Sequence, residues 1–541
     1  MLKVGKKGKH IHHKRVLLIV ESPSKCNTIL NLLGSMLYAC VSTCGHIRKL
    51  KPVLNTSSEP EYEIIESKKG IIAKIKSEIK ISSKVLLATD DDREGESIAW
   101  HACKVFGLSE LSTDRIVFHE ITKAALEYAV MNPRKINMNI VKSQQVRQML
   151  DLRIGYTTTP ILWKAAFTSK VSAGRCQTPA LRLIYDRGRN REFDRECGGY
   201  AVTAYFTKYN LPFQLNKQFD SESQVEQFLN ASVNHAHVMR IENLIPIKKL
   251  VPKPLPFTTS QILQCAFNEL DISSIETMQI CQKLYEKSLI TYCRTNGTKY
   301  SDGNYNYSDS PFPHEPIRPI NLQCAQILGD KFTLNEKRVY KLIWTNAVAN
   351  LNDNEEYLSI RVTCTSPLPD ATYVYESKHM LGGGNSCKAF DSLRFMNNTI
   401  IAHDRIIAAR VFSHHHPHYY TEATLIRALE SLQIGTSSTY ATTIEKLKER
   451  KYVDSVAVDS EYESYELKHK KIVRFKTHMS FEGKKHLIIT PKGLLAIELL
   501  IEHFDTLFSY DYTKQMELKL EEIANGEYVD IHIINNKIDI V

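Results

Sequence analysis

The sequence predicts a multidomain protein with α/β, α and β regions, in which one domain is inserted into another. Its 541 residues suffice for three or four domains of about 150 residues each. Two short apolar runs that end in acids, Arg15–Glu21 and Lys84–Asp90, indicate buried parallel strands. Alternating segments at Gly199–Phe213 and Tyr357–Val362 then indicate half-exposed strands of a separate β-rich region.

The first strands and helices define an α/β domain. A helical pattern at Ile71–Ile81 separates the two apolar runs, and further helical patterns follow at 96–106, 122–130, 142–154 and 179–187. Parallel strands place their carboxyl ends at one edge of a sheet, which is where open α/β sheets bind ligands. Glu21 and Asp90 should therefore lie at that edge.

The later elements explain the predicted insertion. The proline-rich Val251–Pro256 opens a stretch that ends after the loop-like Tyr300–Pro319, and this stretch separates the two alternating segments. After the histidine-rich 413–418, the pattern from Thr421 to Ala524 predicts a strongly helical C-terminal part.

Composition excludes several classes of protein. Apolar residues make up 43% and charged residues 24%, which excludes a disordered or fibrous chain. The formal charge of +10 suits a polyanionic partner without requiring one. None of the 12 cysteines forms a C-x-x-C pair, so we expect no zinc ribbon and a reducing compartment.

Apolar segments are too short for export or membrane insertion. Val16–Val20 is shorter than a signal-peptide core of about 7 to 15 residues. Leu494–Ile501 is interrupted by Glu498 and is far shorter than the roughly 18 residues of a membrane span. The sequence therefore predicts an intracellular protein that is neither secreted nor membrane-bound.

The densest chemical signal is an acidic cluster after the second strand. Asp90, Asp92 and Glu94 can converge on one hard cation such as Mg²⁺. An acidic helix N-terminus, stabilised by the helix dipole, is the alternative interpretation. Glu21 and Lys25 at the same predicted edge favour a functional site.

Asp90-x-Asp92-x-Glu94 with the upstream Glu21 resembles the Toprim fold of topoisomerases, primases and related nucleases. Further motifs make the chain similar to type IA DNA topoisomerases, in the branch of bacterial topoisomerase I and reverse gyrase. They stand in the family order between about residues 15 and 528, at Val20–Lys25, Gly45–Arg48, Phe118–Thr122, Gly155–Lys164, Ser172–Gln177, Pro256–Thr259, Leu289–Arg294, His314–Pro319, Tyr420–Ala423, Ser438–Ala441 and Tyr510–Thr513.

The resemblance implies catalytic roles that the residues alone leave open. Tyr292, which would otherwise pass for a packed strand residue, matches the nucleophile that attacks a DNA phosphodiester. A phenol has a pKa of about 10 and needs nearby cations, for which Arg294 and Lys25 are the matching residues. Glu21 matches the general acid, and the implied Mg²⁺ ligands are Asp90 and Asp92 with Glu94 or Glu21. Neither ATP nor zinc is expected.

The resemblance also implies a groove for single-stranded DNA. Taken alone, Arg147 and Lys164 are ordinary solvated helix charges, and a single histidine is more often a satisfied polar residue. The matching DNA-binding positions are His46, Arg147, Asp151, Lys164, Ser172, Ala173, Gly174, Arg175, Cys176, Gln177, His314, Arg318, Thr439 and Tyr440.

The implied architecture is a type IA toroid of four domains. These are a Toprim domain (1–140), a helical groove domain (141–195 and 418–541), a β-rich arch (196–255 and 340–417) and an inserted gate domain (256–339) that carries Tyr292. The implied enzyme is a monomer in the cytoplasm or another DNA-containing compartment. It cuts one strand, passes a second and religates, relaxing negatively supercoiled DNA.

Some positions depart from the family pattern. Asn296 replaces a frequent acid, Leu152 replaces a usual arginine, and Thr436 resembles the topoisomerase III version. The chain stops soon after Glu527, without the zinc ribbons of many relatives. Thr436 therefore leaves a topoisomerase III-like decatenase as an alternative within the family. From other classes, a Toprim nuclease or primase and an inactive DNA-binding protein remain alternatives, and the intact acids with Lys25 and Tyr292 argue against the last. The basic arm before Val16 is either a DNA contact or a solubilising tail.

Overall fold

The computed structural model describes most of the chain. The described residues are 14–52, 60–165, 171–189, 199–207, 210–242, 247–250, 252–300, 315–351, 356–380, 397–410 and 419–527. His314 and the basic arm before residue 14 lie outside them.

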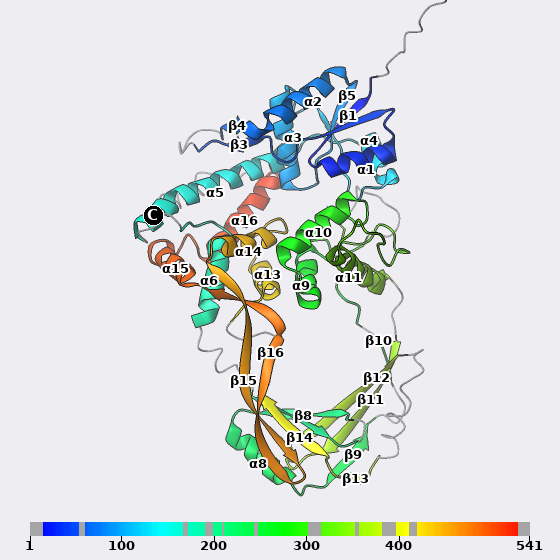
Figure 1. Ribbon diagram of the computed structural model, residues 1–541, viewed down its shortest axis with the longest axis vertical. Coiled ribbons are helices and arrows are strands. Elements are labelled where there is room, and N and C mark those ends of the chain that lie inside the picture. Colours follow the sequence, from blue (N-terminus) through cyan, green and yellow to red (C-terminus); the bar gives the residue numbers. More distant parts are fainter. Residues whose placement is uncertain are drawn as a thin grey trace, which may run out of the picture.

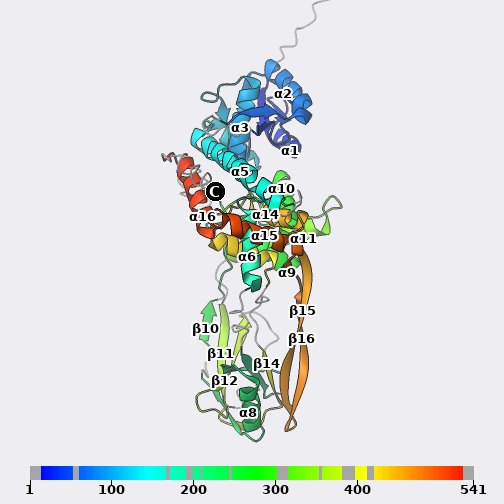
Figure 2. The same ribbon diagram turned by 90° about the vertical axis from the view of Figure 1, so that its left-hand side faces the viewer.

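Four regions are arranged in a ring (Figure 1). An α/β region lies at the top, above a helical region and a smaller helical region that carries Tyr292. A curled sheet closes the ring at the bottom, and one long hairpin reaches it from the helical region, as the side view in Figure 2 also shows. The predicted toroid with mixed α/β, α and β parts is confirmed.

The α/β region is built on a four-stranded parallel sheet in the order β2–β1–β5–β6. Side chains of the central strand β1 are buried on both faces, Leu17 and Ile19 on one and Leu18 and Val20 on the other. This double burial explains the continuous apolar run in the sequence. The elements are β1 (Val16–Val20), α1 (Pro23–Leu33), β2 (Tyr38–Ser42), β3 (Arg48–Leu50), β4 (Tyr62–Ile64), α2 (Lys69–Ile81), β5 (Lys84–Leu87), α3 (Arg93–Phe106), β6 (Asp114–Arg115) and α4 (Lys123–Met131).

The helical region joins two distant stretches of the chain around one core. Its first helix contains Pro160, and its last helix packs back along that first one. The helices are α5 (Met138–Ala165), α6 (Gln177–Arg189), α13 (Glu422–Ser431), α14 (Tyr440–Glu449), α15 (Pro491–Phe504) and α16 (Tyr510–Ala524).

The predicted helical C-terminal part is wrong over residues 453–489. These residues form the antiparallel hairpin β15 (Val453–Lys468) and β16 (Lys471–Ile489), which joins the sheet through β14. His469 and Lys470 both have positive φ, as a two-residue hairpin turn requires. Because this turn lacks the usual asparagine and glycine, the sequence pattern did not reveal it. The base of this hairpin, at Val453 and Leu487, remains in the core of the helical region.

The curled sheet surrounds a core of its own. Its order is β13–β9–β11–β12–β8–β7–β14–β15–β16, with β10 paired to β11. The alternating segment 199–213 is divided between two strands rather than one. The remaining elements are β7 (Tyr200–Tyr205), β8 (Pro212–Phe219), α8 (Glu222–Ser232), β9 (His237–Ile241), β10 (Ile247–Leu250), β11 (Glu356–Thr365), β12 (Thr372–Met380), β13 (Ile400–Ile401) and β14 (Arg405–Arg410).

The Tyr292 region, residues 252–300 and 315–351, packs directly against the α/β region. It contains α9 (Thr259–Leu270), α10 (Ser274–Glu286) and α11 (Leu334–Leu351). One apolar cluster runs from Leu18 and Val20 in β1 to Ile280, Ile290 and Tyr292. The two regions therefore share a core. Among the described residues, no helix combines the length and apolarity needed to cross a membrane.

Gly493 at the start of α15 is fixed by close packing on the hairpin base. A Cβ atom there would lie 2.1 Å from the carbonyl oxygen of Tyr452. We expect Gly493→Ala to destabilise the helical region by about 2 kcal/mol and to lower a calorimetric unfolding midpoint. Gly188→Ala is the control, because that exposed helical position has no neighbour within 4 Å. Equal midpoints for the two variants would contradict this packing constraint.

Candidate active site between the α/β and Tyr292 regions

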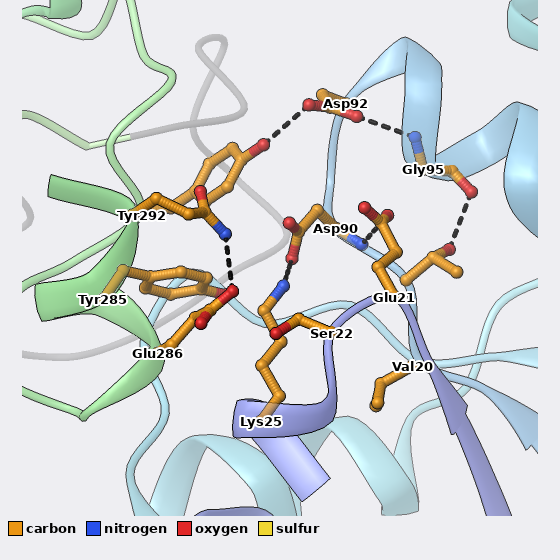
Figure 3. Close-up of polar contacts among 12 residues, drawn as sticks. Val20, Glu21, Ser22, Lys25, Asp90, Asp92, Gly95, Tyr285, Glu286 and Tyr292 are labelled. Carbon is orange, nitrogen blue, oxygen red and sulfur yellow. Dashed lines mark hydrogen bonds and ion pairs between the residues drawn. The ribbon is translucent and has the colours of Figure 1, made fainter. Parts of the chain in front are cut away.

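Acids from two neighbouring strands meet at one edge of the parallel sheet. Glu21 follows β1, and Asp90 lies just beyond β5, whose Leu87 is paired with Ile19. Glu21 Oε1 accepts the backbone N–H of Asp90 at 2.9 Å. Lys25, fully buried in the first turn of α1, forms an ion pair with Asp90. The predicted clustering at this edge is therefore present (Figure 3).

Asp92 is held by the helix that follows it. Its Oδ1 accepts the backbone N–H of Gly95 at 2.7 Å and so caps α3. Gly95 leaves room for this loop, since a Cβ there would lie 2.0 Å from the Asp90 carbonyl oxygen and 2.9 Å from Glu21 Oε1. A side chain at this position would disturb both acids.

Tyr292 reaches across to this loop from the other region. Its hydroxyl donates to Asp92 Oδ2 at 2.7 Å, and its backbone N–H donates to the His119 carbonyl at 2.8 Å. Arg294 Nη1 contacts the same Asp92 oxygen at 2.9 Å and Glu94 Oε2 at 3.2 Å. Figure 3 shows the phenol directed at Asp92, with the Lys25–Asp90 pair beside it.

The site favours neutral forms of two of its groups. Burial, followed by the negative charges of Asp90 and Asp92, raises the pKa of Glu21 to about 8. Burial and Asp92 also raise the pKa of Tyr292 well above its usual value. Burial alone would raise the pKa of Asp92, but Arg294 and the Tyr292 hydroxyl outweigh it and lower that pKa. The phenol is therefore protonated in this closed arrangement.

The acids offer the oxygen ligands that Mg²⁺ prefers. Within the described parts of the chain, however, no three His, Cys, Asp or Glu side chains are placed to hold a metal ion. Lys25 contacts Asp90, whereas Tyr292 and Arg294 contact Asp92. Side chains of the protein thus already donate hydrogen bonds to both aspartates. After burial, repulsion by Asp90 and Asp92 is the next cause of the raised pKa of Glu21, and a divalent cation relieves repulsion of this kind, so the donor set fits Mg²⁺.

A pocket of about 610 Å³ opens beside these acids. Arg147 from α5 and Arg294 supply positive charge, and the loop 436–438 supplies hydroxyl groups. Residues from the α/β, helical and Tyr292 regions all line it. They include Asp92, Arg93, Glu94, Asn137, Arg147, Arg294, Asn296, Thr436, Ser438 and Glu521.

Two of the other predicted DNA-binding residues are buried arginines that form ion pairs within the protein. Buried Arg175 forms ion pairs with Asp151 and Glu517, and buried Arg318 forms ion pairs with Glu120 and Glu315. Their guanidinium groups are already engaged by carboxylates. Sequence reasoning did not foresee the pairs with Glu517 and Glu120, because these partners are remote along the chain. Glu315, by contrast, stands three residues before Arg318 in the same motif.

Two of the predicted DNA-binding motifs, Ser172–Gln177 and Ser438–Ala441, mainly make contacts within the helical region. Ser172 N–H donates to the Tyr452 hydroxyl at 2.7 Å, and Gly174 N–H donates to Thr178 Oγ1 at 3.1 Å. Thr439 Oγ1 accepts the Thr436 N–H at 2.8 Å. Ala173, Gln177 and Tyr440 are buried, Cys176 and His46 are partly buried, and Lys164 is exposed.

Sequence reasoning missed a charge network behind the acids. Buried Arg115 donates to the Asp90 carbonyl at 2.6 Å and contacts Glu96 at 3.2 Å. Arg134 contacts both Glu96 and Asp91, and Asp91 also contacts His119. The only available signal was the placement of Asp91 within the acidic run and of His119 within a motif.

This fold and site define a class of enzyme that pairs a Toprim-like acid cluster with a tyrosine from a second region. Comparisons with known proteins agree: the Toprim domain family matches residues 16–121, and the family described as DNA topoisomerase matches 135–310 and 306–467. The chain belongs to the type IA DNA topoisomerases, isomerases that act on DNA.

Individual relatives extend over nearly the whole chain. DNA topoisomerase 1 of Campylobacter jejuni is 31% identical over 582 residues, covering 95% of this chain and 76% of the relative. DNA topoisomerase 1 of Buchnera aphidicola is 31% identical over 596 residues, covering 97% and 65%. The structure of full-length topoisomerase I from Thermotoga maritima matches with a TM-score of 0.72 and 26% identity, covering 96% and 88%.

The raised pKa of Glu21 gives a defined pH dependence of stability. An unfolded glutamate ionises near pH 4.3, whereas folded Glu21 does so only near pH 8. Protonated Glu21 thus contributes stability that is fully present below about pH 4.3 and is lost as the pH rises towards 8, by a few kcal/mol. With a chelator present, the unfolding midpoint of the wild type should therefore fall relative to that of Glu21→Gln between pH 5 and 8.

The exposed Glu127→Gln provides the matched control, and its curve should run parallel to the wild type. Parallel curves for the wild type and Glu21→Gln across the same interval would contradict the raised pKa.

Proposed function

We propose that this enzyme cuts one DNA strand by transesterification to Tyr292, passes a strand through the break and religates it. The observation that carries the proposal is the 2.7 Å hydrogen bond from the Tyr292 hydroxyl to Asp92. It brings a nucleophile from one region to the acids and cations of another. The exchange of one phosphate ester for another stores the energy of the broken bond, so no ATP is consumed.

Attack requires the phenol to lose its proton, and the residues around it suit this step. Asp92 accepts a hydrogen bond from the hydroxyl at 2.7 Å, and its lowered pKa keeps it ionised. Arg294, beside Asp92, stabilises the emerging phenolate and the phosphate through its fork of donors. Lys25 supplies a second cation and is kept in place by Asp90. The product is a 5′-phosphotyrosine.

The departing 3′ oxygen needs a proton, and we assign its delivery to Glu21. With a pKa of about 8, Glu21 is largely protonated at neutral pH and is suited to act as a general acid. In religation the same carboxylate takes the proton back.

Mg²⁺ belongs to the religation half of the proposal. Asp90 and Asp92, with Glu94 or Glu21, are the residues that would hold it. When bound, the ion supplies positive charge that aligns phosphate groups and neutralises the acids. Lys25 and Arg294 meet the same need while the gate is closed.

We assign the 610 Å³ pocket to the single strand that is cut. Arg147 and Arg294 provide positive charge for phosphates, and the hydroxyl groups of Thr436 and Ser438 provide donors. Residues 256–339 are the proposed gate, which lifts with the cut end attached to Tyr292. Single-stranded segments of negatively supercoiled DNA are the expected substrate of a monomeric enzyme.

Topoisomerase III-like decatenation is the alternative within the family, and Thr436 on the pocket wall favours it. Relaxation of a negatively supercoiled plasmid and unlinking of gapped catenanes, measured at equal salt, discriminate the two. A Toprim nuclease or primase would need the acids but not Tyr292, so a covalent adduct excludes both.

Tyr292→Phe tests the nucleophile directly. Removing one oxygen deletes the attacking atom while keeping the ring, so we expect no covalent adduct and nearly unchanged affinity for single-stranded DNA. The wild type, denatured on labelled DNA, should remain on the 5′ side of the break. The neighbouring Tyr285→Phe is the control and should still form the adduct. A 3′ adduct, or any adduct with Tyr292→Phe, would exclude the proposal.

Asp90→Asn combined with Asp92→Asn tests the metal assignment. We expect loss of Mg²⁺-dependent relaxation. Cleavage should be slower, because the acceptor for the phenol proton is lost, but partly retained, because Arg294 and Lys25 still support attack. Plasmid relaxation and oligonucleotide cleavage should be measured side by side with and without chelator. Full relaxation by the double variant in chelator would show that these acids are not the metal site.

A further inference from the structure

Four successive residues of the α/β region, Phe118–Ile121, each receive a contact from the Tyr292 region. The Tyr285 hydroxyl donates to the Phe118 carbonyl at 3.3 Å, and the Tyr292 backbone N–H donates to the His119 carbonyl at 2.8 Å. Arg318 pairs with the Glu120 carboxylate at 3.1 Å. The Ser288 hydroxyl donates to the Ile121 carbonyl. We call Phe118–Ile121 the docking strip.

The docking strip is tied to the acidic loop through one side chain. His119 Nε2 lies 2.9 Å from Asp91 Oδ2, and because a carboxylate only accepts, Nε2 carries the hydrogen. Asp91 Oδ1 in turn accepts from Arg134 Nη2 at 3.2 Å. Asp91 stands between Asp90 and Asp92, so the contact fixes the strip relative to the acids.

The α/β region thus holds both the backbone and the side chain of Tyr292. Its hydroxyl is bound to Asp92, and its backbone is bound to His119. The Asp91–His119 contact connects these two attachments of Tyr292. His119 binds the backbone of Tyr292, and Asp91 directly precedes Asp92, which binds its hydroxyl. Displacing a nucleophile by about 1 Å can slow a reaction up to about 100-fold.

We propose that Asp91 and His119 are positioning residues for the nucleophile. They set the place of the His119 carbonyl, and through it the reach of Tyr292 to the scissile phosphate. The inference rests on the proposed function of Tyr292. It goes beyond that function because it assigns the placement of Tyr292 to Asp91 and His119, which take no part in the proposed chemical steps. Both side chains are about four-fifths buried.

The experiment measures single-turnover cleavage of a saturating single-stranded oligonucleotide, together with its Kd and the unfolding midpoint. His119→Ala should slow cleavage about 10-fold, within the range for a misplaced reacting group, and leave Kd unchanged. His119→Gln should restore most of the rate, because its amide nitrogen can reach the same carboxylate. The exposed His503→Ala is the matched control and should behave as the wild type.

A second pair of variants guards against misfolding and tests the contact itself. Asp91→Ala should also slow cleavage. The double variant Asp91→Ala with His119→Ala should be no slower than the slower single variant, because each substitution removes the same Asp91–His119 contact. Multiplying effects would overturn the inference. Asp91→Asn keeps the shape of the side chain and supplies the measurement if the alanine variants fold poorly.

Other outcomes are also decisive. Wild-type cleavage by His119→Ala, or no restoration by His119→Gln, would overturn the positioning role. A Kd that rises in proportion to the lost rate would make His119 a DNA contact instead. If the wild type forms no adduct with DNA, both the proposed function and this inference are wrong. If the wild type forms the adduct and the Asp91 and His119 variants cleave at its rate, only this inference is wrong.

Discussion

The hydrogen bond between Tyr292 and Asp92 joins residues 200 positions apart, and the rest of the site is arranged around it. Asp92 can accept it because its other oxygen caps α3, which begins one residue later. That cap depends in turn on Gly95, whose missing side chain leaves space for Asp90 and Glu21. The first turn of α3 therefore fixes the residue that holds the hydroxyl of the nucleophile, while His119 holds its backbone.

Charge balance among the acids and cations stabilises the arrangement of the site. Burying a carboxylate is costly unless it is paired. Asp90 is paired with Lys25 and Asp92 with Arg294, which leaves Glu21 as the acid whose ionisation the site suppresses. In the reaction proposed above, the same cations would bind the DNA phosphate. The substrate would then compete with the acids for Lys25 and Arg294, and Mg²⁺ would compensate the acids.

The sequence predicted the parts of the site that follow from local rules. Two apolar runs ending in acids were enough to place Glu21 and Asp90 at one sheet edge, because parallel strands in register leave no other arrangement. The hairpin 453–489 was missed, since its turn at His469 has an atypical sequence and its pairing partner β14 is remote. The ion pair of Arg175 with Glu517 could not be predicted for a related reason, since the two residues are 342 positions apart.

The contact between the α/β and Tyr292 regions combines two kinds of interaction that respond differently to separation. The shared apolar cluster, from Leu18 to Tyr292, gains free energy in proportion to the area removed from water, with little dependence on exact geometry. The docking strip adds directional bonds, which form only at one relative position of the two regions. In the gate movement proposed above, the apolar surface would draw the two regions together on closure, and the docking strip would restore the register of Tyr292. Precision in this arrangement thus comes from the carbonyls of Phe118, His119 and Ile121 and from the Glu120 carboxylate, rather than from the core.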